Sequence, residues 1–257
     1  MAVEVPRNAT TIVKPSWLKV RAPGSPEYLE TKKIVKDLKL HTVCEEAMCP
    51  NIGECWSHHT ATFMIMGELC TRKCHFCSVK KGTSDTLVAL DPQEPERVGV
   101  AVKELGLKHA VVTSVDRDDV ADNGASHFLQ TVAAIRKHAP GCKVELLIPD
   151  LKGCRQDLET ILSAKIDVLN HNIETVPRLY KKVRPGAGYI RSLSIHRWAK
   201  EIDASTVTKS GIMVGLGETK DEVLGVMDDM RAVGIDVMTI GQYLRPSANQ
   251  LPVRAFI

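Results

Sequence analysis

The chain has 257 residues, of which 44% are hydrophobic and 25% are charged, a balance typical of a globular protein with a buried core. This composition excludes a disordered tail, a collagen-like fibre and a coiled coil. The formal charge of +3 is too small to indicate a nucleic-acid-binding protein.

The first part of the chain, residues 1–60, shows no alternation of strands and helices. It contains prolines, a lysine-rich segment at 28–40 and then a cysteine triplet, Cys44-x4-Cys49-x5-Cys55, so we interpret it as an N-terminal extension. The first 20 residues lack a signal-peptide pattern, and no run approaches the roughly 18 apolar residues of a membrane span. We therefore expect a cytoplasmic protein without a membrane partner. Cytoplasmic thiols stay reduced, so clustered cysteines indicate metal or redox chemistry rather than disulfides.

From residue 61 onward, short apolar runs alternate with stretches of helical period. The expected strands are residues 62–66, 109–114, 143–148, 167–170, 211–215 and 237–242. Residues 95–107 and the segment around Phe128, Val132 and Ile135 have the apolar face of crossover helices, and a capping box at 219–222 predicts the start of another. The pattern predicts an α/β fold, a partial TIM-like barrel of six strand–helix units over residues 61–257.

A second cysteine triplet, Cys70-x3-Cys74-x2-Cys77, follows the first expected strand. Steps of three and four residues span at most ~10 to 14 Å, so one loop can wrap a small inorganic cluster. Most iron–sulfur clusters take four cysteines, so three leave one iron open to a reactive ligand. A zinc knuckle made by Cys74 and Cys77 with Cys49 and Cys55, or with His58 and His59, is the alternative. Cys142 and Cys154 lie apart and are interpreted as ordinary cysteines.

A family resemblance rests on these cysteines and on several other motifs. The segment from Cys70 to Cys77, with Phe76 before the last cysteine, resembles the signature of the radical S-adenosylmethionine (SAM) enzymes. Further motifs are similar to those of the lipoyl synthase family and cover essentially the whole chain: PSWLKV at 15–20, HTVCEEAMCPNIGECW at 41–56, TSVDRDD at 113–119, NHNIET at 170–175, VRPG at 183–186 and QYLRPS at 242–247.

The resemblance implies two 4Fe-4S clusters and SAM as cofactors. Cys70, Cys74 and Cys77 would hold the cluster whose open iron binds SAM, and Cys44, Cys49 and Cys55 would hold an auxiliary cluster. A 5'-deoxyadenosyl radical would remove hydrogen from C6 and C8 of a protein-bound octanoyl-lysine, and the auxiliary cluster would donate the sulfur. An octanoyl methylene has no acidic proton, so side-chain acid–base chemistry cannot functionalise it, and no catalytic residue is expected beyond the clusters and SAM.

The remaining motifs fall where chemistry collects in strand–helix barrels, at the C-terminal ends of the strands. The resemblance leads us to expect SAM contacts from Phe76, Ser114, Asp116, Asn170, Asn172, Glu174, Gln242 and Leu244. Alternatives stay open: Phe76 packs in the core, Asp118 and Asp119 begin a solvated helix, and His171 is a hydrogen-bonded core residue. We interpret several basic residues as solvated side chains, some of them able to dock an acidic carrier domain: Lys32, Lys33, Lys36, Lys80, Lys81, Lys181, Lys182 and Arg184.

Two partners follow from the resemblance. One is an octanoylated lipoyl carrier, either an E2 lipoyl domain or the H protein of glycine cleavage, and the other is a one-electron reductant such as ferredoxin or flavodoxin. The family continues to a C-terminal Arg-Ser-Ser-Tyr motif with a serine ligand for the auxiliary cluster, and this sequence ends at Ile257 without it. We therefore expect SAM cleavage, and complete sulfur insertion only if another ligand serves that cluster.

Other functions are compatible with the same cysteines. A truncated iron–sulfur relative that binds SAM without turnover and an electron-transfer iron–sulfur protein both stay open. A relative of biotin synthase is disfavoured, because that family lacks the arrangement of Cys44, Cys49 and Cys55.

Overall fold

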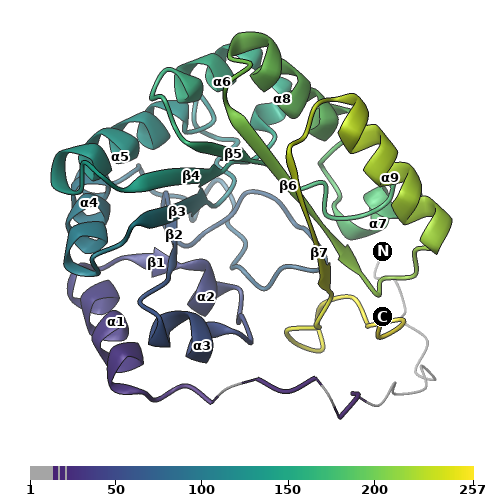
Figure 1. Ribbon diagram of the computed structural model, residues 1–257, viewed down its shortest axis with the longest axis horizontal. Helices are drawn as coiled ribbons and strands as arrows, with labels where there is room; N and C mark the ends of the chain where they lie inside the picture. The colour runs from purple at the N-terminus through teal and green to yellow at the C-terminus, as the bar shows by residue number, and fades with distance from the viewer. Residues whose placement is uncertain (1–13, 17, 21) are drawn as a thin grey trace.

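The computed structural model describes residues 14–16, 18–20 and 22–257 (Figure 1). Residues 1–13 of the expected extension and Trp17 of its motif lie outside the described residues. One curved sheet of seven strands forms the centre, in the order β1 to β7. The strands are β1 (His41–Thr42), β2 (Thr62–Ile65), β3 (His109–Ser114), β4 (Lys143–Leu147), β5 (Val168–Asn170), β6 (Val207–Val214) and β7 (Val237–Gln242).

Strands β2 to β7 are parallel, and only the short β1 runs antiparallel to its neighbour β2. The register places Phe63 of β2 opposite Val112 of β3, and Ile212 of β6 opposite Ile240 of β7. Among the described strands, β7 pairs with β6 alone, so the curved sheet stays open. This confirms the predicted partial barrel of six parallel strands.

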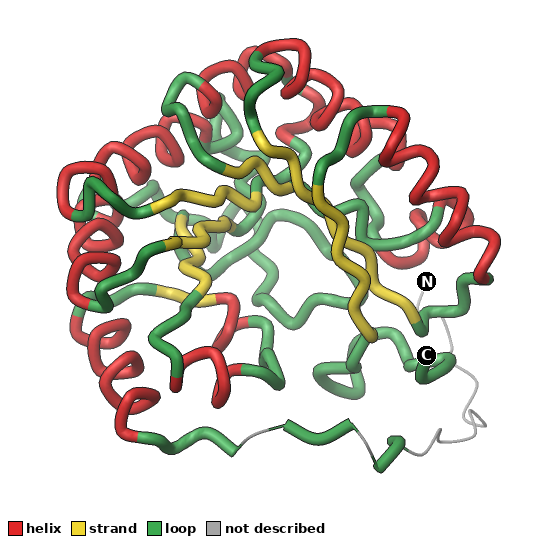
Figure 2. Tube along the Cα trace, in the orientation of Figure 1, coloured by secondary structure: helices red, strands yellow, loops and turns green. Residues whose placement is uncertain are grey.

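The longer helices lie in an arc outside the sheet (Figures 1 and 2). The helices are α1 (Pro26–Asp37), α2 (Val43–Glu46), α3 (Ile52–Ser57), α4 (Glu94–Glu104), α5 (Ala125–His138), α6 (Arg155–Leu162), α7 (Tyr180–Val183), α8 (Tyr189–Ile202) and α9 (Lys220–Ala232), with short 3-10 turns at η1 (Leu151–Gly153) and η2 (Pro177–Leu179). Loops and the short helices occupy the inside of the curve (Figure 2). The parallel strands therefore direct their carboxyl ends toward this interior.

The sequence pattern explains how the outer helices attach to the sheet. Val98 and Val102 of α4 and Phe128 and Ile135 of α5 are fully buried in the main core. Each such side chain contributes roughly 1.5–3 kcal/mol relative to an exposed one. The predicted capping box of α9 is present, since Thr219 accepts from the Glu222 amide and the Glu222 carboxylate accepts from the Thr219 amide.

Strand β6 begins at Val207, four residues before the predicted start at Gly211. The prediction was wrong there because Thr208 and Ser210 are polar but fully buried. Their hydroxyls are satisfied locally: Thr208 Oγ1 donates to the Gly234 carbonyl oxygen at 3.1 Å and Ser210 Oγ to the His171 carbonyl oxygen at 2.9 Å. Such hydrogen bonds let polar residues occupy a buried strand.

The N-terminal helices have a small core of their own. Cys44, Trp56 and Ala61 form this third core, against which Tyr28 and Ile52 pack, separate from the two cores of the barrel. The division of the chain at residue 60 stays a prediction, since β1 of the expected extension pairs with β2 of the barrel. No helix of the described residues has both the length and the apolar character needed to cross a bilayer.

Candidate active site

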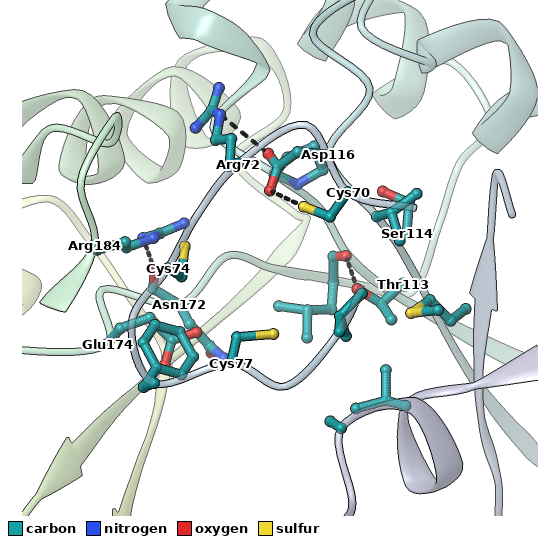
Figure 3. A pocket seen from close by; sticks show the side chains of 18 of the residues that line it. Cys70, Arg72, Cys74, Cys77, Thr113, Ser114, Asp116, Asn172, Glu174 and Arg184 are labelled. Atoms are coloured by element: carbon teal, nitrogen blue, oxygen red, sulfur yellow. Dashed lines mark hydrogen bonds and ion pairs between the residues drawn. The ribbon is translucent and has the colours of Figure 1, made fainter. Parts of the chain in front are cut away.

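The second cysteine triplet lies on the loop that follows β2, here called the cluster loop (residues 70–81). Backbone hydrogen bonds close this loop at its base, from the Cys70 amide to the Lys80 carbonyl and from the Gly82 amide to the Cys70 carbonyl, both at 2.9 Å. All three thiols line one cavity of about 250 Å³ (Figure 3). The cavity lies at the carboxyl ends of β3, β4 and β5, where barrel chemistry is expected.

Two of these thiols, Cys70 and Cys74, have poorly solvated sulfur atoms. Burial, with a smaller contribution from the Asp116 carboxylate, raises the pKa of Cys70 to about 12, and burial raises the pKa of Cys74 to about 11 against the opposing charge of Arg184. Cys70 Sγ lies 3.7 Å from Asp116 Oδ2, to which it donates. Thiols with such high pKa values become thiolates when a metal supplies positive charge.

The first triplet is carried by α2, the turn after it, and α3. Cys44 is buried and Cys49 and Cys55 are half-buried. Burial raises the pKa of Cys44 and of Cys55, and the charge of Cys49 raises both further. The three thiols of this triplet are thus near enough to interact electrostatically.

Residues beside the first triplet border the cavity that the second triplet lines. Val43 and Ala47, at the start of α2 and just after its end, form part of the cavity wall that faces the cluster loop. Ser78 Oγ of the cluster loop donates to the Glu46 carbonyl oxygen at 2.9 Å and ties the loop to α2. The segment that carries the first triplet therefore borders this cavity, although none of Cys44, Cys49 and Cys55 lines it.

The residues expected to contact SAM divide between two cavities. Phe76, Ser114, Asp116, Asn172 and Glu174 line the first cavity. Gln242 and Leu244 line a second cavity of about 440 Å³, which Phe76, Cys77 and Ala47 also border. Asn170 lines neither, because its amide donates to Glu145 Oε1 at 2.8 Å.

Two features of the first cavity fit a bound polar ligand. Ser114 Oγ is buried without a hydrogen-bond partner among the described residues. This hydroxyl is therefore free to donate a hydrogen bond to a ligand atom or to accept one from it. Glu174 is held in a left-handed backbone conformation with φ of 69°, fixed by hydrogen bonds of its backbone to Gly211 and Met213. Burial raises the pKa of its carboxyl.

Arg184 is a correction to the sequence-based interpretation, which treated it as a solvated side chain. The side chain is buried and lines the first cavity. Arg184 Nη1 donates to the Asn172 carbonyl oxygen at 2.7 Å and to Tyr180 Oη at 3.2 Å. One helical turn separates Tyr180 from Arg184, so the two share an inward face, while Lys181 and Lys182 between them are exposed. That spacing was the available signal.

Two further residues of the site were missed. Arg72 of the cluster loop is buried in the cavity wall, and the fully buried Asp150 binds it at 2.6 Å. Asp118, interpreted as a possible helix start, accepts from Arg72 Nε at 2.8 Å, whereas Asp119 pairs with Arg117. A charged residue between two cysteines gives no sequence signal of burial.

The alternatives for the other cysteines and histidines can be placed as well. Among the described residues, no three His, Cys, Asp or Glu side chains converge as they would around a single ion, either in the zinc set or in the two cysteine triplets. Cys142 packs in the main core, and Cys154 precedes α6. His171 is fully buried with Nδ1 2.8 Å from the Ile148 carbonyl oxygen, the environment of a core histidine.

Comparisons with known proteins agree with this geometry. Residues 64–230 match the model of the radical SAM superfamily, and residues 4–49 match that of the N-terminal domain of lipoyl synthase. A lipoyl synthase of Rubrobacter xylanophilus is 56% identical over 243 residues, which cover 95% of this chain and 75% of that protein.

Solved structures show the same fold at low sequence identity. A maturase of the [FeFe]-hydrogenase, HydG, matches 74% of this chain with a TM-score of 0.60 and 15% identity. Streptococcus suis SuiB bound to S-adenosylmethionine matches 80% with a TM-score of 0.58 and 12% identity. The chain spans 45% and 47% of their respective lengths.

The open barrel and the three cysteines on the loop after its first parallel strand define a radical SAM enzyme, a class whose members use a 4Fe-4S cluster and SAM. Within that class, the chain belongs to the lipoyl synthase family. The resemblance that the motifs indicated is thereby confirmed, as is the sulfur-inserting kind of enzyme.

Proposed function

We propose that this chain inserts sulfur at C6 and C8 of an octanoyl group bound to a lysine of a lipoyl carrier protein. The observation that supports this most strongly is the shared cavity: the cluster loop lines one side, and Val43 and Ala47, from the segment that carries Cys44, line the other. A reaction that makes a carbon radical and then traps it with sulfur requires both groups beside the same carbon.

In this proposal each cysteine triplet holds one 4Fe-4S cluster. Cys70, Cys74 and Cys77 hold the cluster that binds SAM, and Cys44, Cys49 and Cys55 hold the auxiliary cluster. When bound, the first cluster and SAM supply the hydrogen-abstracting radical and the second cluster supplies sulfur. Three cysteines at each site agree with one iron left for another ligand.

The polar residues of the first cavity bind and orient SAM. Arg184 makes no ion pair with a carboxylate of the described chain, so its buried charge is free to hold the SAM carboxylate. Ser114 and Asn172 supply hydrogen-bonding groups, and Asp116 and Glu174 face the positive end of the cofactor. Phe76 separates this cavity from the second one, where Gln242 and Leu244 lie.

The apolar wall of the cavity receives the acyl chain and excludes water. It is formed by Met64, Val115, Leu147 and Ile148 from the barrel, with Val43 from the side of α2. Apolar contact stabilises a methylene chain at about 0.8 kcal/mol for each buried CH2. A dry wall also gives an intermediate radical no solvent to react with.

The proposed reaction needs two partners, an octanoylated E2 lipoyl domain or H protein and a one-electron reductant such as ferredoxin or flavodoxin. We expect the reaction in the cytoplasm, where the cysteines stay reduced.

The test is anaerobic reconstitution followed by reaction with SAM, dithionite and an octanoyl-lysine peptide. We expect about eight irons per chain, four for each cluster, together with 5'-deoxyadenosine and a peptide that gains two sulfur atoms. Cys74→Ala should abolish SAM cleavage, Cys44→Ala should keep cleavage but lose sulfur insertion, and Cys154→Ala should change neither.

The same assay distinguishes the alternatives. SAM cleavage without a sulfur-containing peptide would identify a relative that does not complete turnover, and clusters without cleavage would identify an electron carrier. The assay is run in parallel on the chain extended through the family's Arg-Ser-Ser-Tyr segment. Sulfur insertion by the extended chain alone would show that this segment supplies a ligand of the auxiliary cluster.

A further inference from the structure

Arg72 connects the cluster loop to two loops of the barrel through three carboxylates (Figure 3 shows its pair with Asp116). Its guanidinium binds Asp118 through Nε at 2.8 Å and Nη2 at 2.9 Å, and Nη2 lies 2.6 Å from Asp150. Arg72 Nε also lies 3.4 Å from Asp116 Oδ1. Asp116 and Asp118 follow β3, and Asp150 follows β4.

The neighbourhood of Arg72 is strongly anionic and poorly solvated. Arg72 and Asp150 are buried, with 7% and 0% of their surface exposed. The one other cation of the described residues paired with these aspartates is Arg191, 3.2 Å from Asp150 and partly exposed. Two arginines therefore pair with three carboxylates, and Arg184 acts on Asp116 without pairing with it. Arg72 carries most of the balance because it touches all three carboxylates.

Asp116 extends this network to the cluster itself. One oxygen of its carboxylate faces Arg72, and the other lies 3.7 Å from the sulfur of Cys70. The backbone is fixed at the same point, since the Thr71 amide donates to the Asp116 carbonyl oxygen at 2.9 Å and Thr71 Oγ1 does so at 3.0 Å. A carboxylate beside a cluster ligand favours the oxidised cluster unless a cation compensates it.

We propose that Arg72 is a positioning residue with two roles: its forked contacts hold the cluster loop on the barrel, and its charge compensates Asp116 and so raises the reduction potential of the cluster bound by Cys70, Cys74 and Cys77. This rests on the ligand assignment in the proposed function. The planar fork serves the first role and the positive charge the second, so lysine and glutamine substitutions separate them.

The experiment measures the reconstituted holoenzyme in two ways that do not depend on turnover. An EPR-monitored reductive titration gives the midpoint potential of the SAM-binding cluster, and the rate of iron release to a chelator reports how firmly the loop holds it. Arg72→Gln should move the potential to a more negative value and speed iron release several-fold. Arg72→Lys should speed release and leave the potential near that of the parent.

A double variant and a matched control sharpen the test. Arg72→Gln/Asp116→Asn should bring the potential back toward the parent value, because the uncompensated carboxylate is gone. Arg117→Gln removes another buried arginine, one that pairs with Asp119 and donates to the Val88 carbonyl oxygen at 2.8 Å, and should leave the potential unchanged.

An unchanged potential and release rate in Arg72→Gln would overturn the proposal, and so would an equal shift in Arg117→Gln. If Arg72→Gln fails to fold, Arg72→Lys decides the positioning role by its release rate. A parent chain that takes up no cluster at all would instead contradict the proposed function.

Discussion

At the scale of single residues, the proposed function assigns the buried cation of Arg184 to the bound SAM. Replacing Arg184 with Met keeps much of its length and removes the charge. We expect SAM binding to weaken about ten- to a hundredfold, since a charged hydrogen bond contributes roughly 1.5–3 kcal/mol. The measurement is the dissociation constant for SAM by equilibrium dialysis on the reconstituted chain.

Lys182→Met is the control for this substitution. It removes the positive charge of an exposed residue of α7 that lies two positions before Arg184 in the sequence. SAM affinity equal in the two variants would mean that Arg184 has only a structural role.

A second residue-scale prediction concerns Asp167, which ties the start of β5 to β4 and α5. Although burial opposes ionisation, hydrogen bonds from Lys143, the Val144 amide and Arg136 lower the pKa of Asp167 to about 2. Because the folded-state pKa is depressed, the stabilisation is present above the unfolded pKa of ~3.9 and is lost as the pH falls through about 2.

Asp167→Asn should therefore lower the free energy of unfolding by about 1–2 kcal/mol at pH 7 and much less near pH 2. Urea unfolding of the apoprotein at several pH values measures the difference. The exposed Asp85→Asn is the control, and a deficit that does not depend on pH would contradict the assignment.

That Cys70, Cys74 and Cys77 lie at one cavity could be predicted from the sequence, because their spacing is local to one loop. Ser114, Asn172 and Glu174 were predictable as a group, since parallel strands end at one edge. Arg72 and Asp150 were not predictable. Arg72 is 46 residues from Asp118 and 78 residues from Asp150 along the chain, and only the fold brings the three together. Their burial depends on tertiary pairing of charges, which a single sequence does not reveal.

At the scale of elements, the contact between α4 and α5 depends on a glycine. A Cβ added at Gly99 would lie 2.7 Å from the Ala134 carbonyl oxygen of the neighbouring helix. Gly99→Ala should force the helices apart and cost about 1–3 kcal/mol of unfolding free energy. Gly225→Ala, on the exposed face of α9 with open space around it, should instead add about 0.5–1 kcal/mol.

Urea unfolding of the two variants checks this pair. Stabilisation by both substitutions would show that α4 and α5 can adjust to a methyl group, contrary to the close packing seen here.

The strands and outer helices were predictable because each has a sequence periodicity that matches its burial. Val98 and Val102 mark the inner face of α4 and Phe128 and Ile135 that of α5. The two residues of β1 have no such periodicity, and their pairing with β2 arises only when the chain folds back. The start of β6 was not predicted, because Thr208 and Ser210 are polar residues whose hydroxyls are buried in the strand.

At the scale of the whole molecule, the exposed lysines of α7 suit an acidic carrier. Lys181 and Lys182 make no ion pair with the described residues, and the Lys182 carbonyl oxygen lies 2.7 Å from His75 Nδ1 of the cluster loop. Lys181→Glu/Lys182→Glu should weaken binding of an octanoylated carrier roughly tenfold at low salt, and much less at high salt.

Fluorescence anisotropy with a labelled carrier measures this, and a short neutral octanoyl-lysine peptide should bind equally to both forms. Lys32→Glu/Lys36→Glu, on the exposed side of α1, is the charge-matched control. The same loss of carrier affinity in the control would assign the effect to net charge alone.

The small core around Trp56 has a consequence for the life of the enzyme. In the proposed function the auxiliary cluster gives up sulfur, so a further turnover requires a new cluster and surroundings that open and close again. Cys44, Trp56 and Ala61 form a core of their own, whereas Val43 and Ala47 of the same segment pack against the main core of the barrel. We therefore expect local opening to begin around Trp56 while the barrel stays packed. The part of the molecule that binds SAM in this proposal thus stays folded while sulfur is reloaded.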